Sequence, residues 1–156
     1  MLIITPEKLK QIADDLDTGM VCHYHKVTGE IEVYPHELSN PGFDEEFWED
    51  VMEKVSENRD DYIEFEPMSS RESFRVMENF ISKIDDIRIH NKFIDAISRK
   101  RPFANFKDAL DYYPELREQW LVFKNQAYID YVKEQIDAAN FDEENERWHE
   151  VSVKKN

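Results

Sequence analysis

The feature that most constrains the fold is a run of paired aromatic residues between residues 99 and 123. Phe103 and Phe106 stand three residues apart, and so do Trp120 and Phe123. Side chains at this spacing on an α-helix lie on the same face. The pattern therefore predicts two amphipathic helices whose aromatic faces fill a hydrophobic core, and it requires no chemistry.

The length and composition are those of a folded protein with one core. A chain of 156 residues buries roughly two-thirds of the surface that its unfolded form exposes. Hydrophobic residues form 40% of the chain, which is enough to fill such a core. The 3 glycines are too few for a barrel or sandwich rich in tight turns, and they form neither a Rossmann nor a P-loop pattern.

Apolar and polar residues alternate in three segments, which predicts a small antiparallel sheet. Two strands are expected over residues 20–27 and 30–34, joined in a hairpin with Gly29 in the left-handed conformation. A third strand is expected over residues 61–66, because an isolated hairpin is marginally stable. With the helices below, this sheet predicts an α+β fold.

Local start signals predict five or six helices. Thr5 and Pro6 form an N-cap followed by proline at the first helical position, and Asp44 is a second N-cap. Ser69 and Glu72 have the spacing of a capping box. Further helices are expected after Asp86, over residues 103–110 and over residues 114–139. We expect one α+β domain over residues 1–140, braced by the last helix, and a charged, partly disordered tail over residues 141–156.

Cysteine content and hydropathy predict a cytoplasmic protein. Cys22 is the one cysteine and has no partner for an internal disulfide. The first residues lack the basic and apolar segments of a secretion signal. No apolar run approaches the roughly 20 residues of a membrane helix, so no membrane partner is expected.

Charge is unevenly distributed along this acidic chain, whose formal net charge is −15. Residues 42–66 contain 11 acidic and 2 basic residues, whereas residues 88–107 contain 6 basic residues and 1 acidic residue. Such polarity can orient the encounter with a charged partner. It is equally compatible with two complementary faces of one fold.

Three segments carry a resemblance to a known family: the run from Ser70 to Phe80, the run from Phe103 to Asp108, and the run from Pro114 to Trp120. With them the chain resembles a bacterial uncharacterised protein family of the UPF type, best over residues 62–136 and also in the hairpin. The resemblance implies no activity, cofactor or catalytic residue, because the family has none assigned.

Candidate catalytic and metal-binding residues all have a structural interpretation that we favour. His23 and His25 share one face of the first strand, and His36 or Glu32 would complete a metal site, but an exposed face of the hairpin explains both histidines. Cys22 is expected to be buried as a small hydrophobic residue. Serines 69 and 70 and the adjacent pairs of carboxylates are expected to cap helices or face solvent. We therefore assign no catalytic, cofactor-binding or metal-binding residue.

Basic residues near the aromatic pairs form a possible binding patch. Arginines in such a setting either clamp an acidic ligand or pair with nearby glutamates, and we favour internal pairing for Arg71, Arg75 and Arg117. Cations beside aromatic rings are also the components of a nucleic-acid surface. The patch comprises Arg71, Arg75, Arg99, Lys100, Arg101, Lys107 and Arg117.

The sequence favours a non-catalytic protein-interaction or adaptor domain of the bacterial cytoplasm. A protein partner would dock either on the acidic segment around Trp48 or on the basic patch around Arg101. One alternative is an RNA-associated protein that uses residues 99–101. Another is a small hydrolase or metal-dependent enzyme, although no cofactor is expected.

Overall fold

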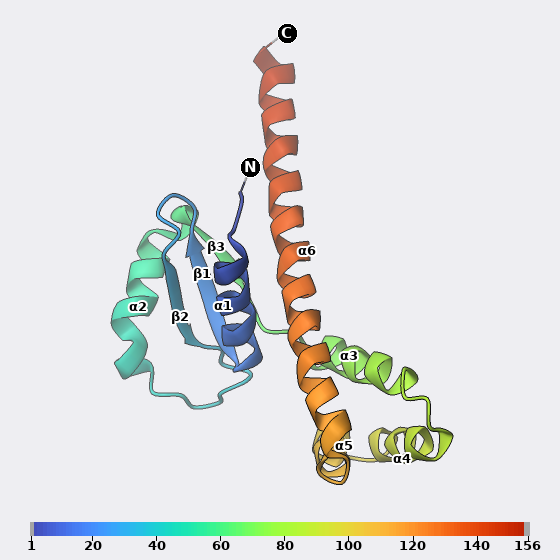
Figure 1. Cartoon of the computed structure of the whole chain (residues 1–156). Coiled ribbons are helices and arrows are strands. Elements are labelled where there is room, and N and C mark those ends of the chain that lie inside the picture. Colours follow the sequence, from blue (N-terminus) through green and yellow to red (C-terminus); the bar gives the residue numbers. More distant parts are fainter. Residues whose placement is uncertain (1, 155–156) are drawn as a thin grey trace. The chain divides into compact units, whose positions relative to one another are not determined.

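The computed structural model describes the backbone of residues 2–154 and the side chains of residues 2–146 (Figure 1). The chain forms two compact units. Unit 1 consists of Met1–Pro67 and Tyr128–Asn156, and unit 2 consists of Met68–Ala127. Compactness alone does not define independent folding, so the single domain over residues 1–140 stays a prediction.

Unit 1 contains the predicted three-stranded antiparallel sheet. Strands β1 (Met20–His25), β2 (Ile31–Pro35) and β3 (Tyr62–Phe65) are arranged in the order β2-β1-β3. Gly29 lies in the turn between β1 and β2 with φ 73°, as predicted, because this left-handed region favours glycine. The third strand therefore joins the hairpin along its β1 edge and makes β1 the central strand.

Helices lie on both sides of this sheet (Figure 1). Helix α1 (Pro6–Asp17) starts at the Thr5 N-cap and buries its apolar face against β1. Helix α2 (Glu45–Glu57) starts at the Asp44 N-cap and lies beside β2, and the short helix η1 (Arg59–Asp61) leads into β3. Successive residues of β1 therefore face α1 and α2 in turn.

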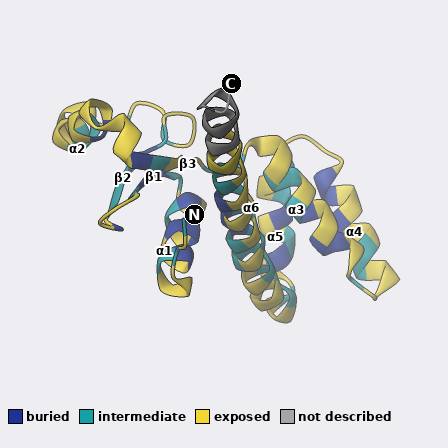
Figure 2. Cartoon of the chain, turned by 90° about the horizontal axis from the view of Figure 1, so that it is seen from above, coloured by how far each residue is buried: buried dark blue, intermediate teal, exposed yellow. Residues whose placement is uncertain are grey.

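Unit 2 is built from helices alone (Figure 2). It contains α3 (Ser70–Ser82), α4 (Ile87–Ile97), α5 (Pro102–Asp111) and the first turns of α6 (Pro114–Lys154). The predicted capping box is present at the start of α3. The buried core of the unit consists of Met77, Phe80, Ile81, Phe93, Ile97, Phe106 and Leu110.

The aromatic pairs predicted to fill this core do so unequally. Phe106 is 2% exposed, and half-buried Trp120 and Phe123 pack against the core. Phe103, by contrast, is 38% exposed, so the prediction of an inward-facing side chain is wrong for this residue. Phe106 and Leu110 set the buried stripe of α5, and Phe103 lies on the same side of the helix, about 20° from Leu110 around the axis. Phe103 is in the first turn of α5, however, where it contacts half-buried Phe74 at the edge of the core.

Helix α6 continues to Lys154, beyond the end predicted near residue 139. No glycine or proline interrupts residues 140–154, which removes the usual stop signals. Asn140 also fixes the helix within unit 1, because its side-chain amide accepts from Leu2 N at 2.7 Å and donates to Leu2 O at 3.1 Å. Partial disorder of residues 141–156 stays a prediction, and Lys155 and Asn156 lie outside the described residues.

Among the described residues, none of the helices combines the length and the hydrophobicity that crossing a bilayer requires.

Candidate functional site

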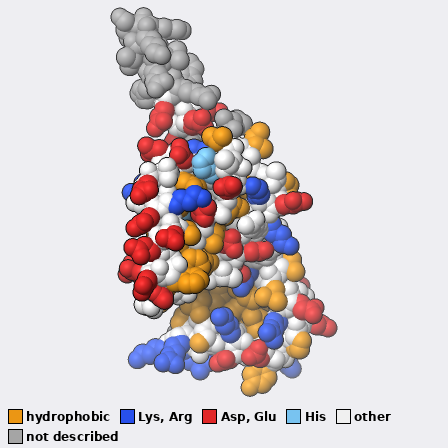
Figure 3. All heavy atoms as spheres, turned by 90° about the vertical axis from the view of Figure 1, so that its left-hand side faces the viewer, with side chains coloured by type: hydrophobic (Ala, Val, Ile, Leu, Met, Phe, Trp, Pro, Cys, Tyr) orange, Lys and Arg blue, Asp and Glu red, His pale blue; other side chains and the backbone are white. Residues whose placement is uncertain are grey.

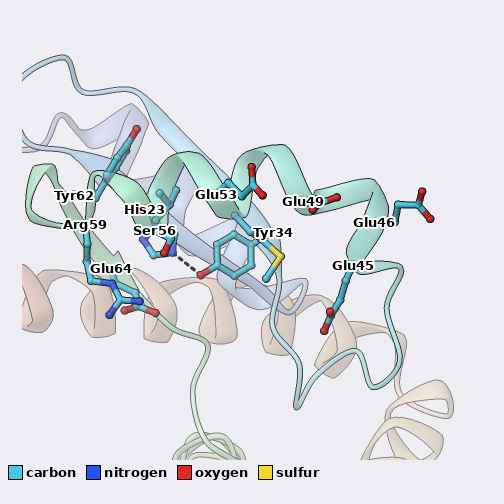
Figure 4. Close-up of a pocket in the computed structure, with 12 residues that line it drawn as sticks. His23, Tyr34, Glu45, Glu46, Glu49, Glu53, Ser56, Arg59, Tyr62 and Glu64 are labelled. Atoms are coloured by element: carbon cyan, nitrogen blue, oxygen red, sulfur yellow. Dashed lines mark hydrogen bonds between the residues drawn. The ribbon is translucent and has the colours of Figure 1, made fainter.

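A pocket of about 730 Å³ lies in unit 1 between helix α2 and the sheet (Figure 4). Its volume is within the usual range for ligand pockets of roughly 300–1,000 Å³. Strands β1, β2 and β3, helix α2 and helix η1 all contribute to it. The lining residues are His23, Tyr34, Glu45, Glu46, Glu49, Met52, Glu53, Val55, Ser56, Arg59, Tyr62 and Glu64.

His23 and two tyrosines form the aromatic floor of the pocket. His23 is only 5% exposed, and its Nε2 forms a 3.0 Å hydrogen bond with Tyr34 Oη (Figure 4). The rings of His23 and Tyr34 stack with centroids 5.2 Å apart, and Tyr62 meets His23 edge-on at 6.3 Å. The antiparallel register explains this grouping: Tyr34 pairs with Val21 on β1, so it is a diagonal neighbour of His23.

Burial sets the protonation of this floor. Loss of hydration lowers the pKa of His23, and the nearby positive charge of Arg59 lowers it further against the opposing effect of Glu66. Burial also raises the pKa of Tyr34, with Glu64 adding to the effect. At neutral pH the floor therefore consists of an uncharged imidazole bonded to an uncharged phenol.

Glutamates dominate the remainder of the lining. Glu45, Glu49 and Glu53 recur every four residues on α2, so they share one face of the helix. Glu46 and Glu64 bring the number of lining carboxylates to five, against one cation. Acidic side chains also gather over the face of unit 1 that carries α2 (Figure 3). Like charges four residues apart cost a helix about 0.2–0.5 kcal/mol per pair, so α2 carries this row at the expense of stability.

The two histidines of β1 do not form a joint metal site. His25 Nδ1 accepts hydrogen bonds from the backbone N–H groups of Val27 at 3.2 Å and Thr28 at 3.1 Å, which closes the hairpin turn. The prediction that both histidines are exposed is wrong. Helix α2 covers His23, which is buried, and His25 is half-buried with its ring centroid 5.1 Å from that of Tyr62. Among the described residues, no group of three or more His, Cys, Asp and Glu side chains is placed to hold a metal ion.

Cys22 lies on the opposite face of β1 and is fully buried, as predicted. Its Sγ approaches Asp15 Oδ2 at 3.8 Å and Ile12 O at 4.0 Å. Burial, followed by the negative charge of Asp15, strongly raises the pKa of the thiol. Since the thiolate is the reactive form of cysteine, Cys22 is a structural residue.

All seven residues of the predicted basic patch lie in unit 2 and are exposed, and Lys and Arg side chains gather at one corner of that unit (Figure 3). Two of the seven form exposed ion pairs: Arg99 with Asp95 at 3.5 Å, and Arg117 with Asp111 at 3.8 Å. No ion pair of the described residues involves Arg71 or Arg75, so the pairing predicted for these two is not found.

The comparison with known proteins agrees with the predicted resemblance. The sequence matches the model of the "Uncharacterised protein family (UPF0158)" over residues 6–154. The chain belongs to this family. One UPF0158 relative, "UPF0158 protein PA5073" of Pseudomonas aeruginosa, is 24% identical over 119 residues, which are 76% of this chain and 72% of the relative. No solved structure matches the chain.

The acidic pocket of this UPF0158 protein was not predicted from its sequence. The acidic segment around Trp48 was predicted as one of two possible docking surfaces for a protein partner, but no pocket was predicted there, and Tyr34, Tyr62 and Arg59 were not singled out. One signal was available: Glu45, Glu49 and Glu53 recur every four residues beside the apolar Met52 and Val55. That pattern shows which side chains share a helix face, but it does not show that the face overlies a sheet.

Proposed function

We propose that this protein is a non-catalytic interaction module of the bacterial cytoplasm, and that its acidic pocket binds a positively charged segment of a partner protein. One observation carries the proposal: five glutamates and one arginine line a pocket that has a floor of aromatic rings. The family model adds no competing activity, because UPF0158 is uncharacterised.

The lining fits lysine and arginine side chains better than it fits other groups. Carboxylates accept charge-assisted hydrogen bonds from guanidinium and ammonium groups. Tyrosine rings attract the same cations through their faces, and the apolar surfaces of Met52 and Val55 suit the methylene stems of those side chains. An anionic ligand would meet the repulsion of five carboxylates.

Repulsion among the glutamates that line the pocket also favours binding of a cation. Without a ligand, Glu45, Glu49 and Glu53 repel one another along α2. A bound cation replaces this repulsion with attraction. The surplus negative charge of residues 42–66 also steers cationic partners toward the pocket.

The test is a fluorescence-anisotropy titration with a labelled peptide of alternating arginine and alanine. The double variant Glu49→Gln/Glu53→Gln removes two lining carboxylates and should weaken binding about tenfold, which corresponds to about 1.4 kcal/mol. The matched control is Asp50→Asn/Glu57→Gln, which removes the same charge from the same helix outside the pocket lining.

The control variant should keep its affinity within about twofold, because surface charges away from the contact are largely screened at physiological salt. Equal losses in the two variants would assign binding to the overall charge of α2 and contradict a pocket. A wild-type protein that does not bind the peptide at low salt would contradict the proposal altogether.

A further inference from the structure

We propose that unit 2 carries a second binding surface, which takes single-stranded nucleic acid. The inference is independent of the proposed function, because it concerns other residues and a partner of opposite charge. The cationic-aromatic surface, as we call it, consists of Arg71, Phe74, Arg75, Arg101, Phe103 and Lys107.

Two phenylalanine rings join the helices that form this surface. Phe74 of α3 and Phe103 of α5 meet edge to face, with ring centroids 6.3 Å apart. Phe74 is half-buried and Phe103 is 38% exposed, so the rings remain partly open to solvent at the boundary of the core. Exposed aromatic rings are the platforms on which unpaired bases stack.

Cations surround these rings. Arg71 and Arg75 flank Phe74 on the same face of α3, and Lys107 lies one turn after Phe103 on α5. These three side chains and that of Arg101 are exposed, and none of them takes part in an ion pair of the described residues. In a chain with 35 acidic residues, four neighbouring cations without an acidic partner leave their charge available to a ligand.

The distribution of charge supports the same conclusion. Residues 68–127 contain 11 Lys and Arg and 9 Asp and Glu, a net charge of +2, whereas the rest of the chain contains 9 and 26, a net charge of −17. The negative charge that would repel a nucleic acid is therefore carried by residues outside unit 2.

The backbone of Arg101 has an unusual conformation. With φ 59° and ψ 56°, it lies in the left-handed region, and it is the one non-glycine residue with positive φ in the described part of the chain. Glycine adopts this conformation without steric cost. The chain thus holds a guanidinium group two residues before Phe103 in a position where the backbone alone favours glycine.

A single strand uses both components of the surface. Its phosphates pair with the four cations, while its unpaired bases stack on the phenylalanine rings. A duplex hides the faces of its bases, and an acidic peptide offers carboxylates without bases. The rings therefore favour a single-stranded nucleic acid over either alternative.

The test is an anisotropy titration of the full chain with fluorescein-labelled oligouridine of about a dozen nucleotides, within the usual range of single-strand site sizes. The DNA oligomer of matching sequence, an RNA duplex and a labelled oligoglutamate form the other arms. Circular dichroism establishes that each variant is folded.

The Arg71→Gln/Arg75→Gln variant should weaken binding about tenfold or more and lower the slope of log affinity against log salt by about 1.4, because each lost phosphate contact contributes about 0.7. Arg88→Gln/Lys124→Gln removes two charges from unit 2 outside the surface and is the control. Phe103→Ala should weaken binding about fivefold or more without changing that slope, because it removes stacking and no charge. Phe47→Ala, at a 74% exposed position of α2, is its control.

The inference is supported if the protein binds single-stranded RNA or DNA more tightly than it binds the duplex and oligoglutamate. The single strand with the higher affinity then identifies the class of nucleic acid. Absence of single-strand binding at about 50 mM salt overturns it. It is also overturned if oligoglutamate binds as tightly and Phe103→Ala changes nothing, a result that would assign the surface to an acidic protein.

Discussion

Single residues in this protein depart from their local preference where the surroundings impose another state. His23 is a polar residue of a central strand that is buried beneath a helix, with its imidazole bonded to Tyr34. Arg101 adopts a backbone conformation that favours glycine. Each departure has a thermodynamic consequence that can be measured.

His23 makes the stability of the protein depend on pH. Because its pKa in the folded state lies below the ordinary value of 6.5, the unfolded chain binds a proton more readily than the folded chain does. Its contribution is therefore complete above pH 6.5 and declines as the pH falls from 6.5 toward the folded-state pKa. Urea unfolding of the wild type and of His23→Gln at pH 7.5 and 5.5 should show the wild type losing more stability. Parallel losses would contradict a neutral, buried His23.

Arg101→Gly should stabilise the protein. Relief of the left-handed conformation contributes about 1–2 kcal/mol, and the greater freedom of glycine in the unfolded chain opposes it by about 0.5–1 kcal/mol. The expected net gain in the free energy of unfolding is about 0.5–1 kcal/mol, measured by urea denaturation. Lys100→Gly is the control, since Lys100 is not at positive φ and should lose stability instead. A loss in both variants would show that Arg101 is not strained.

At the scale of elements, capping residues and apolar stripes define the helices, while the two proposed binding surfaces include exposed side chains of helices α2, α3 and α5. Thr5, Asp44, Ser69 and Asp86 each accept a backbone N–H at the start of a helix. Helix α2 combines such a cap with a row of mutually repelling glutamates. The cap therefore favours helix formation at the N-terminus of α2, and the row of glutamates is the face to which we assign the proposed cationic ligand.

Ser69→Ala should destabilise unit 2 by about 1 kcal/mol, because it removes the side chain that accepts from Glu72 N at 3.2 Å. The reciprocal bond of the box, from the backbone N–H of residue 69 to Glu72 Oε1 at 3.2 Å, remains possible in the variant. Ser70→Ala is a matched control, since Ser70 is the first residue of α3 and forms no capping bond. Urea denaturation monitored by tryptophan fluorescence measures the difference. Equal effects in the two variants would contradict the capping interpretation of Ser69.

At the scale of the whole molecule, opposite charges separate into the two compact units. The acidic pocket belongs to unit 1, and the cationic-aromatic surface belongs to unit 2. Helix α6 contributes residues to both units. A protein with this distribution can recognise two classes of partner at once, which is the property expected of an adaptor.

The two surfaces should bind independently. Glu49→Gln/Glu53→Gln is expected to leave oligouridine affinity within about twofold of the wild type, and Arg71→Gln/Arg75→Gln should do the same for the arginine peptide, since separate sites without shared partners give additive effects. The affinity of each variant is measured with both oligouridine and the arginine peptide. Coupling beyond about tenfold would contradict independent binding.

Much of the secondary structure could be predicted because its signals are local. The caps at Asp44 and Ser69, the left-handed Gly29 and the alternation along β1 depend on neighbours within a few residues. The antiparallel three-stranded sheet followed from the same patterns, whereas the family was indicated by the resemblance of three sequence segments to its members. The end of α6 was missed because no local stop signal marks it.

The amino-acid sequence by itself determined the helices, the strands and the separation of charge, since these are properties of spacing and composition. Only the tertiary structure decided that α2 covers His23 and that Phe103 lies at the edge of the core. The physical reason is that periodicity fixes which side chains share a face, whereas burial depends on which other element covers that face. Both proposed binding surfaces depend on that second, non-local choice.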